Sequence, residues 1–259
     1  MGELRFIGLG LHDEKGITIR GLEEARACDV LFAEFYTSAL VGMGPRGLEA
    51  LLGKEVRVLR REQVEAGDAI LEAARDRRVA LLVAGDPMAA TTHVDLRLRA
   101  AAQGIGTRIV HGVSILTAAA GALGLQSYKF GRTTTVPFPA PGFDPTSPLE
   151  GILANLRAGL HTLVLLDLRD DGTSLDPKDA LRRLLEAADR ARAYELGPTT
   201  LACVLSRVGS PDGRAAADRV EDLLERDLGP PLHCLVVPGS LHFLEKEALV
   251  AFAGAPQDV

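Results

Sequence analysis

Residues 79–93, VALLVAGDPMAATTH, decide the fold, because a strand, a turn and the start of a helix follow one another there. Val79–Ala84 is an unbroken apolar run, which is typical of a buried parallel strand. It stops at Gly85-Asp86-Pro87, and a helical segment is predicted from Thr91 or Thr92. Ligands of α/β proteins bind at the carboxyl ends of parallel strands, where backbone groups and helix N-termini converge. This stretch therefore predicts a ligand site that includes Asp86, and the competing interpretation is that Asp86 serves only the turn.

The first half of the chain continues the same pattern on both sides of this stretch. Short apolar runs alternate with amphipathic segments, which predicts a mostly parallel sheet with helices on both faces. Thr18 and Ser114 are suited to cap helices. Strands are expected at residues 4–9, 30–35, 56–59, 79–84 and 107–111, and helices at 18–27, 47–52, 69–76, 92–103 and 114–122.

The second half begins with a segment of different composition. Residues 131–148 hold five prolines, which favour a strand at 133–138 followed by a loop. Residues 215–228 have helical spacing, with a strand at 216–220 as the alternative. Further strands are expected at 162–168, 200–206 and 233–237, and helices at 149–158, 177–193 and from 241 or 242. Two α/β domains, residues 1–112 and 113–259, fit this order better than one long sheet.

Composition excludes several classes of protein. The formal net charge of −6 over 259 residues argues against a general nucleic-acid binder, which needs a basic surface. Cys28, Cys203 and Cys234 are odd in number and lack C-x-x-C spacing, so reduced, packed thiols are expected rather than a disulfide framework or a zinc site. The start of the chain lacks the features of a signal peptide, and no apolar run is long enough for a membrane span. A cytoplasmic protein is therefore expected.

A glycine turn follows the first predicted strand, in Gly8-Leu9-Gly10. A dinucleotide fingerprint would need a third glycine at position 13, where Asp13 stands. Asp13 and Glu14 would also repel a pyrophosphate beside the helix start. This argues against a Rossmann oxidoreductase and leaves a loop that approaches a ligand without phosphates.

Other strand ends carry similar signals. His111-Gly112-Val113-Ser114-Ile115 again leads from a strand to a helix, so three strand ends at one sheet edge would outline a pocket. In the second half, comparable ends follow the strands at Leu166, at Ser206 and at Pro238-Gly239. The histidines have no spacing that suggests a metal site, and neither a P-loop nor a nucleophile elbow is present in the sequence.

Six segments together resemble the diphthine synthases, a family within the tetrapyrrole methylase superfamily of S-adenosylmethionine (SAM)-dependent methyltransferases. They are FIGLGL (6–11), AEFYTS (33–38), GDP (85–87), ATTH (90–93), YKFG (128–131) and VPG (237–239). The likeness covers essentially the whole chain in order. The glycine loop and GDP are shared across the superfamily, whereas AEFYTS and ATTH are more specific to diphthine synthases.

The resemblance implies two α/β domains with SAM bent in the cleft between them, and a homodimer. Ala89 stands where related enzymes often have valine, and Val208 where alanine can occur, so backbone contacts would be preserved at both. The resemblance carries SAM contacts onto Leu11, Asp86, Ala89, Ser114, Ile115, Leu166, Val208 and His233.

The implied reaction is methylation, expected three times, of the amino group of the 3-amino-3-carboxypropyl-histidine intermediate on translation elongation factor 2. The products are diphthine, an intermediate of diphthamide biosynthesis, and S-adenosylhomocysteine. Because SAM is an activated donor, alignment in a dry cleft can supply most of the rate, and no catalytic residue is assigned.

The amine must lose a proton before each transfer, and Glu34, Tyr36, Asp86 and His93 are conceivable acceptors. Lys129, Arg132 and Arg207 are conceivable partners for the substrate carboxylate. Two alternatives stay open at this point: a precorrin or cobalt-corrin C-methyltransferase of the same superfamily, and a non-catalytic nucleotide-binding module.

Overall fold

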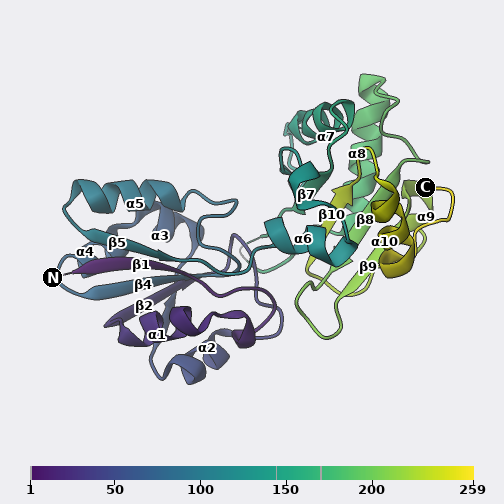
Figure 1. The fold of residues 1–259 in the computed structure, drawn as a ribbon. Helices are drawn as coiled ribbons and strands as arrows, with labels where there is room; N and C mark the ends of the chain where they lie inside the picture. Colours follow the sequence, from purple (N-terminus) through teal and green to yellow (C-terminus); the bar gives the residue numbers. More distant parts are fainter. Residues whose placement is uncertain (1, 144, 170) are drawn as a thin grey trace. The chain divides into compact units, whose positions relative to one another are not determined.

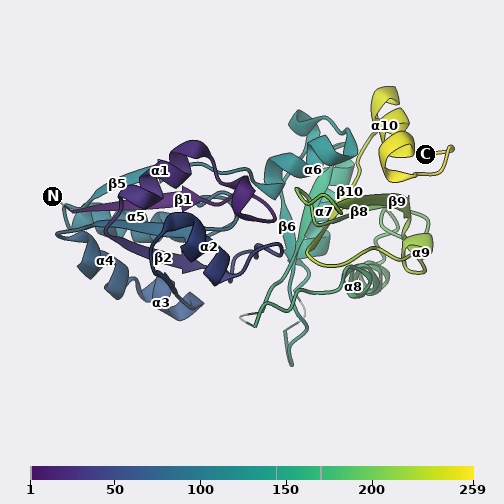
Figure 2. The ribbon, with the colours of Figure 1, turned by 90° about the horizontal axis from the view of Figure 1, so that it is seen from below.

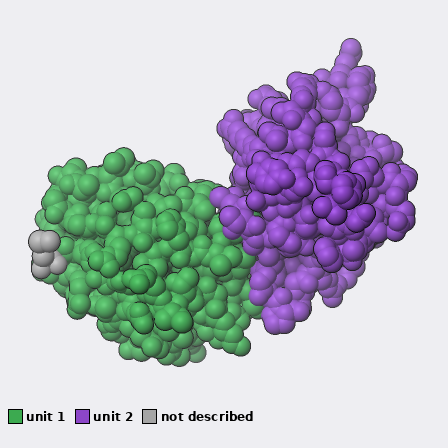
Figure 3. Space-filling view, in the orientation of Figure 1, with its two compact units in different colours: residues 1–115, 169–172 green, residues 116–168, 173–259 purple. Residues whose placement is uncertain are grey.

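The protein divides into two compact units, coloured green and purple in Figure 3. A computed structural model describes residues 2–143, 145–169 and 171–259. Unit 1 comprises Met1–Ile115 with Arg169–Gly172, and unit 2 comprises Leu116–Leu168 with Thr173–Val259. The domain limits 1–112 and 113–259 remain a prediction.

Unit 1 is built on a parallel five-stranded sheet (Figure 1). Every pairing in it is parallel, in the strand order β3-β2-β4-β1-β5. The strands are β1 (Glu3–Gly8), β2 (Val30–Glu34), β3 (Val56–Val58), β4 (Arg78–Val83) and β5 (Gly106–Val110). This confirms the predicted parallel sheet, with β1 and β4 side by side at its centre.

Helices cover both faces of this sheet, as Figures 1 and 2 show. Phe6 packs in a core with α3, α4 and α5, whereas the next residue, Ile7, packs in a second core with α1 and α2. The helices are α1 (Ile19–Ala27), α2 (Pro45–Leu52), α3 (Arg61–Ala66), α4 (Asp68–Ala74) and α5 (His93–Ala102). Burial on both faces explains why the strands read as continuous apolar runs. Thr18 caps α1 as predicted, because its hydroxyl accepts from Gly21 N at 2.9 Å.

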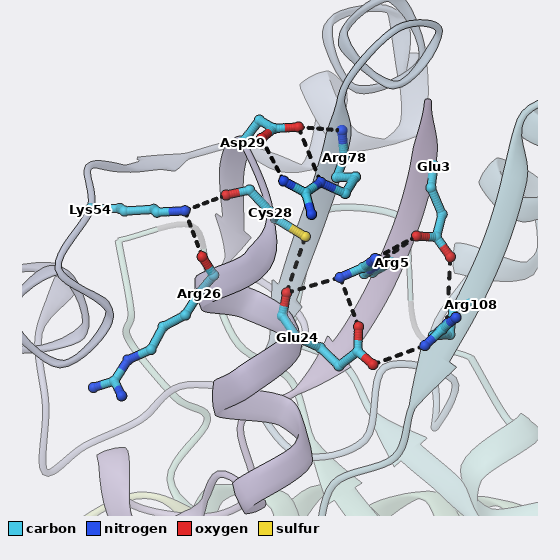
Figure 4. Close-up of polar contacts among 9 residues, drawn as sticks. All are labelled: Glu3, Arg5, Glu24, Arg26, Cys28, Asp29, Lys54, Arg78 and Arg108. Atoms are coloured by element: carbon cyan, nitrogen blue, oxygen red, sulfur yellow. Dashed lines mark hydrogen bonds and ion pairs between the residues drawn. The ribbon is translucent and has the colours of Figure 1, made fainter. Parts of the chain in front are cut away.

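Charged side chains form ion pairs and hydrogen bonds at the amino edge of the same sheet (Figure 4). The guanidinium of Arg5, which is 7% exposed, lies 2.7 Å from carboxylate oxygens of both Glu3 and Glu24. Lys54 Nζ donates to backbone carbonyls at the end of α1, and Arg78 pairs with Asp29 at 3.1 Å. The charges at the amino edge therefore satisfy one another within unit 1.

Unit 2 contains a mixed sheet in the order β6-β7-β10-β8-β9. Only the β6–β7 pair is parallel, and the other three pairs are antiparallel. The strands are β6 (Thr134–Val136), β7 (Thr162–Leu166), β8 (Leu201–Ser206), β9 (Arg214–Arg219) and β10 (His233–Val237). The strand alternative for residues 216–220 is therefore right up to Arg219, and the helical interpretation of 215–228 is wrong except for a single turn at Val220–Leu223.

The helices of unit 2 lie on both sides of its sheet. They are α6 (Ile115–Leu123), α7 (Ser147–Arg157), α8 (Pro177–Ala191), α9 (Val220–Leu223) and α10 (Phe243–Ala253). Leu149 and Ile152 of α7 join Leu181 and Leu184 of α8 in one apolar core. The three cysteines are buried and carry free thiols, as predicted.

Candidate functional site

Four glycines bring the ends of β1, β4 and β5 into backbone contact. Gly10 and Gly85 exchange backbone hydrogen bonds of 3.2 and 2.8 Å, and both have a positive φ near 75°. A Cβ added to Gly8 would lie 2.6 Å from Gly112 N and from Gly85 O. A Cβ added to Gly112 would lie 2.4 Å from Gly85 O. The three predicted strand ends therefore meet at one edge, at a spacing that no side chain other than glycine permits.

Asp86 joins two of these strand ends. Its Oδ1 accepts from Met88 N at 2.9 Å, which stabilises the turn after β4. Its Oδ2 accepts from His111 Nδ1 at 2.7 Å and from Gly112 N at 3.3 Å, both in the exit of β5. The carboxylate is only 13% exposed, whereas the His111 side chain is 71% exposed. The turn interpretation of Asp86 is thus correct in part, and the same carboxylate also fixes the spacing of the two exits.

The predicted SAM residues of unit 1 all follow these strand ends. Leu11 comes directly after the Gly10–Gly85 bridge, and Ala89 N donates to Asp86 O at 3.2 Å. Ser114 is 9% exposed and precedes Ile115, the first residue of α6. The structure therefore places all five on the loops at the carboxyl edge of one parallel sheet.

The predicted residues of unit 2 share an edge of its own sheet. The register of β10 with β7 pairs Cys234 with Leu165, so His233 lies opposite Leu166, the last residue of β7. His233 also pairs with Ser206 at the end of β8, two residues before Val208. His233 Nε2 donates to Gly229 O at 3.1 Å, and burial lowers the pKa of this imidazole below its usual value. His233 thus favours the uncharged form near neutral pH.

The glycine-lined edge of unit 1 fits a nucleoside that carries no phosphate. Gly8, Gly85 and Gly112 let the backbones of the three strand ends approach one another closely, and the Asp86 carboxylate supplies negative charge at this edge for a sulfonium or an ammonium. Asp13 caps a 3-10 turn beside this edge, and its carboxylate disfavours a phosphate. The residues present therefore fit SAM. Among the described residues, no group of three or more His, Cys, Asp or Glu side chains could hold a metal ion.

Two of the resemblance segments are structural parts of unit 2. Lys129 of the YKFG segment donates to Glu245 Oε2 and to Ser240 O, each at 2.5 Å. Gly239 of the VPG segment donates through its N–H to His161 Nδ1 at 2.9 Å. His161 Nε2 in turn donates to Glu245 Oε1 at 3.0 Å. Lys129 thus has partners inside the protein, contrary to its suggested role as partner of a substrate carboxylate.

Glu245 is the centre of this buried cluster, with its side chain 1% exposed. Burial alone would raise its pKa, but hydrogen bonds from Lys129, from two backbone N–H groups and from His161 together lower the pKa to about 2. Arg207 is similarly engaged, with Asp212 at 3.0 Å and Pro231 O at 2.7 Å, whereas Arg132 is exposed. Of the three suggested partners for a substrate carboxylate, the structure leaves Arg132 the most accessible.

The chain is similar to known methylases over almost its whole length. Residues 3–224 match the model of the Tetrapyrrole (Corrin/Porphyrin) Methylases. A diphthine synthase of Methanothermobacter thermautotrophicus is 46% identical over 99% of this chain and 97% of its own. One of Halorubrum lacusprofundi is 48% identical over 99% of this chain and 98% of its own. A crystal structure of a diphthine synthase superposes with a TM-score of 0.90 at 38% identity, covering 98% of this chain and 97% of the other. No helix in the described part of the chain is long and apolar enough to span a membrane.

Proposed function

The chain belongs to the tetrapyrrole methylases and is a methyltransferase, and we propose that it acts as a diphthine synthase. Its acceptor is the amino group of the 3-amino-3-carboxypropyl-histidine intermediate on translation elongation factor 2, in diphthamide biosynthesis. The observation that carries this proposal is 46–48% identity to proteins named diphthine synthase over practically the full length of both partners. The corrin-methylase and nucleotide-module alternatives are not favoured by these relatives.

The proposed methyl donor is SAM, with S-adenosylhomocysteine as its product. Leu11, Asp86, Ala89, Ser114 and Ile115 are proposed to contact it from unit 1. Leu166, Val208 and His233 are the proposed contacts of unit 2. Support comes from the placement of each set along a single sheet edge, and from the close backbone approach at Gly8, Gly85 and Gly112.

The reaction requires alignment more than acid–base chemistry. SAM supplies a methyl group on a positively charged sulfur, so the acceptor nitrogen must be held in line with that group and kept free of water. Such positioning corresponds to effective molarities of about 10⁵–10⁸ M in well-oriented systems. Asp86 serves this end by fixing the distance between the exits of β4 and β5. We expect three transfers, which give a trimethylammonium product.

We further propose that the enzyme works as a homodimer in the cytoplasm, where its protein substrate acts in translation. The assembly is measured by light scattering of the purified chain across a concentration series. A mass corresponding to one chain at every concentration contradicts the dimer.

The deciding experiment is mass spectrometry of elongation factor 2 that carries the histidine intermediate. Incubation with this protein and SAM is expected to add mass in methylene steps, up to three of them. Elongation factor 2 with an unmodified histidine is the matched control and should gain no mass. Absence of any gain on the modified substrate contradicts the proposed function.

A further inference from the structure

A buried carboxylate lies at the end of β2, outside the glycine-lined edge described above. Glu34 is 0% exposed and accepts from Tyr36 N at 3.0 Å, from Thr37 N at 3.1 Å and from the Thr37 hydroxyl. Among the described residues no Lys or Arg forms an ion pair with it, and the only cationic candidate within 4 Å is His93. Three hydrogen-bond donors stabilise this buried carboxylate, and a positive charge beside it would stabilise it further.

His93, the first residue of α5, faces this carboxylate with an acceptor. Its Nδ1 lies 2.9 Å from Pro87 O, and a carbonyl only accepts, so the proton of the neutral imidazole is on Nδ1. In the neutral imidazole Nε2 is then a lone pair, and this atom lies 3.8 Å from Glu34 Oε1 without a hydrogen-bond partner. With a neutral His93, two acceptors therefore face each other in the interior, and a donor placed between them would satisfy both.

Two hydroxyl groups in the segments that carry this pair also lack partners. Tyr36 OH and Thr91 Oγ1 are buried and unpaired, and they belong to the same two segments, 33–38 and 90–93, as Glu34 and His93. Burial, followed by the negative charges of Glu34 and Glu65, raises the pKa of Tyr36, so its hydroxyl keeps its proton. Native structures rarely leave several buried polar atoms unpaired in one place, which points to a ligand that pairs with them.

The surroundings favour a cation. His93 lines a cavity of about 290 Å³ together with Val64, Glu65, Thr92, Asp95 and Leu96. Glu65 and Asp95 bring two carboxylates to this cavity. Arg99 pairs with Asp95 at 3.4 Å, and the Arg61 guanidinium lies 5.2 Å from the centre of the Tyr36 ring. Both arginines are therefore engaged in contacts with other residues of unit 1. Asp95 is thus already paired, and Glu65 is the cavity carboxylate that favours a positively charged ligand.

We propose that the Glu34–His93 pair is the subsite that receives the alkylammonium group of the methyl acceptor and takes its proton. An ammonium nitrogen placed about 2.8 Å from each of these two atoms, which are 3.8 Å apart, would donate to both. His93 is also bonded to Pro87, the neighbour of Asp86, so one turn connects this subsite with the proposed SAM residues. The inference rests on the proposed function and names the site of its acceptor.

The step balances in protons and electrons. His93 Nε2 takes one proton from the ammonium, and Glu34 stabilises the imidazolium that forms. The freed lone pair on nitrogen forms a bond to the methyl carbon while the carbon–sulfur bond breaks and its electron pair stays on sulfur. The proton then leaves His93 for solvent, and the new ammonium repeats the step. After three transfers the nitrogen carries no N–H, so it has no donor for this pair and the product is released.

Tyr36→Phe tests the subsite without removing any internal hydrogen bond. Because Tyr36 OH has no partner, a purely structural role predicts unchanged or higher stability and unchanged kinetics. The subsite predicts the same stability with the KM for modified elongation factor 2 raised about tenfold, since a hydrogen bond to a charged group is lost. An unchanged KM and kcat overturns the proposal.

Glu34→Gln removes the charge and keeps the shape of the side chain. The expected result is a KM raised about ten- to a hundredfold, with unchanged affinity for S-adenosylhomocysteine by calorimetry. Glu62→Gln, on an exposed position of α3, is the matched control and should behave as wild type. Equal effects of both variants on KM, or a parallel loss of S-adenosylhomocysteine affinity in Glu34→Gln, contradict the subsite.

A spectroscopic measurement separates this inference from the proposed function. The ¹⁵N resonance of His93 Nε2, assigned with His93→Gln, should shift on addition of 2-aminobutyrate, which carries an ammonium, and stay unchanged with butyrate. The shift should vanish in Glu34→Gln. Identical responses to both probes overturn the subsite, even if elongation factor 2 is methylated. A specific shift in an enzyme that leaves elongation factor 2 unmodified supports an amine subsite and contradicts only the proposed protein substrate.

Discussion

At the scale of single residues, two kinds of position can be distinguished in this protein. Gly8, Gly85 and Gly112 act through the absence of a side chain, whereas Asp86 acts through a carboxylate that holds two loops together. Both kinds lie at the carboxyl edge of the sheet in unit 1. Their substitution should therefore give distinct results, one in folding and the other in ligand affinity.

Gly112→Ala should destabilise the fold. The new methyl group would lie 2.4 Å from Gly85 O and 3.0 Å from Gly8, and backbone atoms at both places have little freedom to move. We expect the free energy of unfolding to fall by about 2 kcal/mol, measured by urea denaturation. Gly121→Ala is the control, because it lies inside α6 with no atom within 4 Å of the added carbon. It should be neutral or stabilise by about 0.5–1 kcal/mol, and equal losses in both variants would refute the steric account.

Asp86→Asn should weaken SAM binding more than folding. The amide keeps an oxygen for Met88 N but loses the charge that holds His111, so the exits of β4 and β5 separate. S-adenosylhomocysteine affinity, measured by calorimetry, is expected to fall about tenfold, with about 1 kcal/mol of stability lost. The exposed Asp76→Asn should change neither quantity. An unaltered affinity in Asp86→Asn would remove Asp86 from the ligand site.

At the scale of elements, sequence patterns predicted each long strand and helix of unit 1. Continuous apolar runs such as Val79–Ala84 identify strands that are buried on both faces, and Thr18 marks a helix start. The short helix α3 was missed because Val64 is its only buried residue and gives no periodicity. β9 was given helical spacing because Ala215–Ala217 fit either period, and its antiparallel pairing with β8 decides between them.

Glu245 holds α10 against the rest of unit 2, so the free energy of unfolding should decrease in acid. Its pKa is about 2 when folded and near 4.5 when unfolded, so its contribution is fully present above the unfolded value. That contribution is lost as pH falls from about 4.5 to about 2. Glu245→Gln should cost about 3 kcal/mol at neutral pH and nothing near pH 2, measured by urea unfolding across this range. Glu247→Gln, exposed on the same helix, should cost little at any pH, and a loss in Glu245→Gln that does not depend on pH would contradict the linkage.

At the scale of the whole molecule, the order of elements predicted two α/β regions but not the direction of the strands in the second. Apolar runs at Leu201–Ser206 and His233–Val237 identify strands. Whether these strands run parallel or antiparallel depends on how the connecting segments cross the sheet, which is set by tertiary packing and not by the local pattern. The candidate site shows the same limit. Glycines and Asp86 could be placed at strand ends from sequence alone. The pairing of Glu34 with His93 joins positions 59 residues apart through the turn after β4, which no spacing rule encodes.

Ligand binding should stabilise the molecule as a whole. S-adenosylhomocysteine at a hundredfold excess over its Kd is expected to raise the free energy of unfolding by about 2.7 kcal/mol, because it binds the folded state. Thermal denaturation with and without the ligand measures this shift, with adenosine as the comparison. Absence of any shift at saturating ligand would contradict SAM as the methyl donor.

The glycine contact among β1, β4 and β5 also bears on how such an enzyme can diversify. At these positions substitution has no side chain to exchange, and an added methyl group would clash with neighbouring backbone atoms and disrupt the fold first. If these strand ends hold the proposed methyl donor, descendants of this protein would keep that donor nearly unchanged. New acceptors would arise from the side chains at the end of β2 and the start of α5, where Glu34 and His93 can be exchanged without touching the glycines. The same fold can thus retain one methyl donor while its methyl acceptor changes.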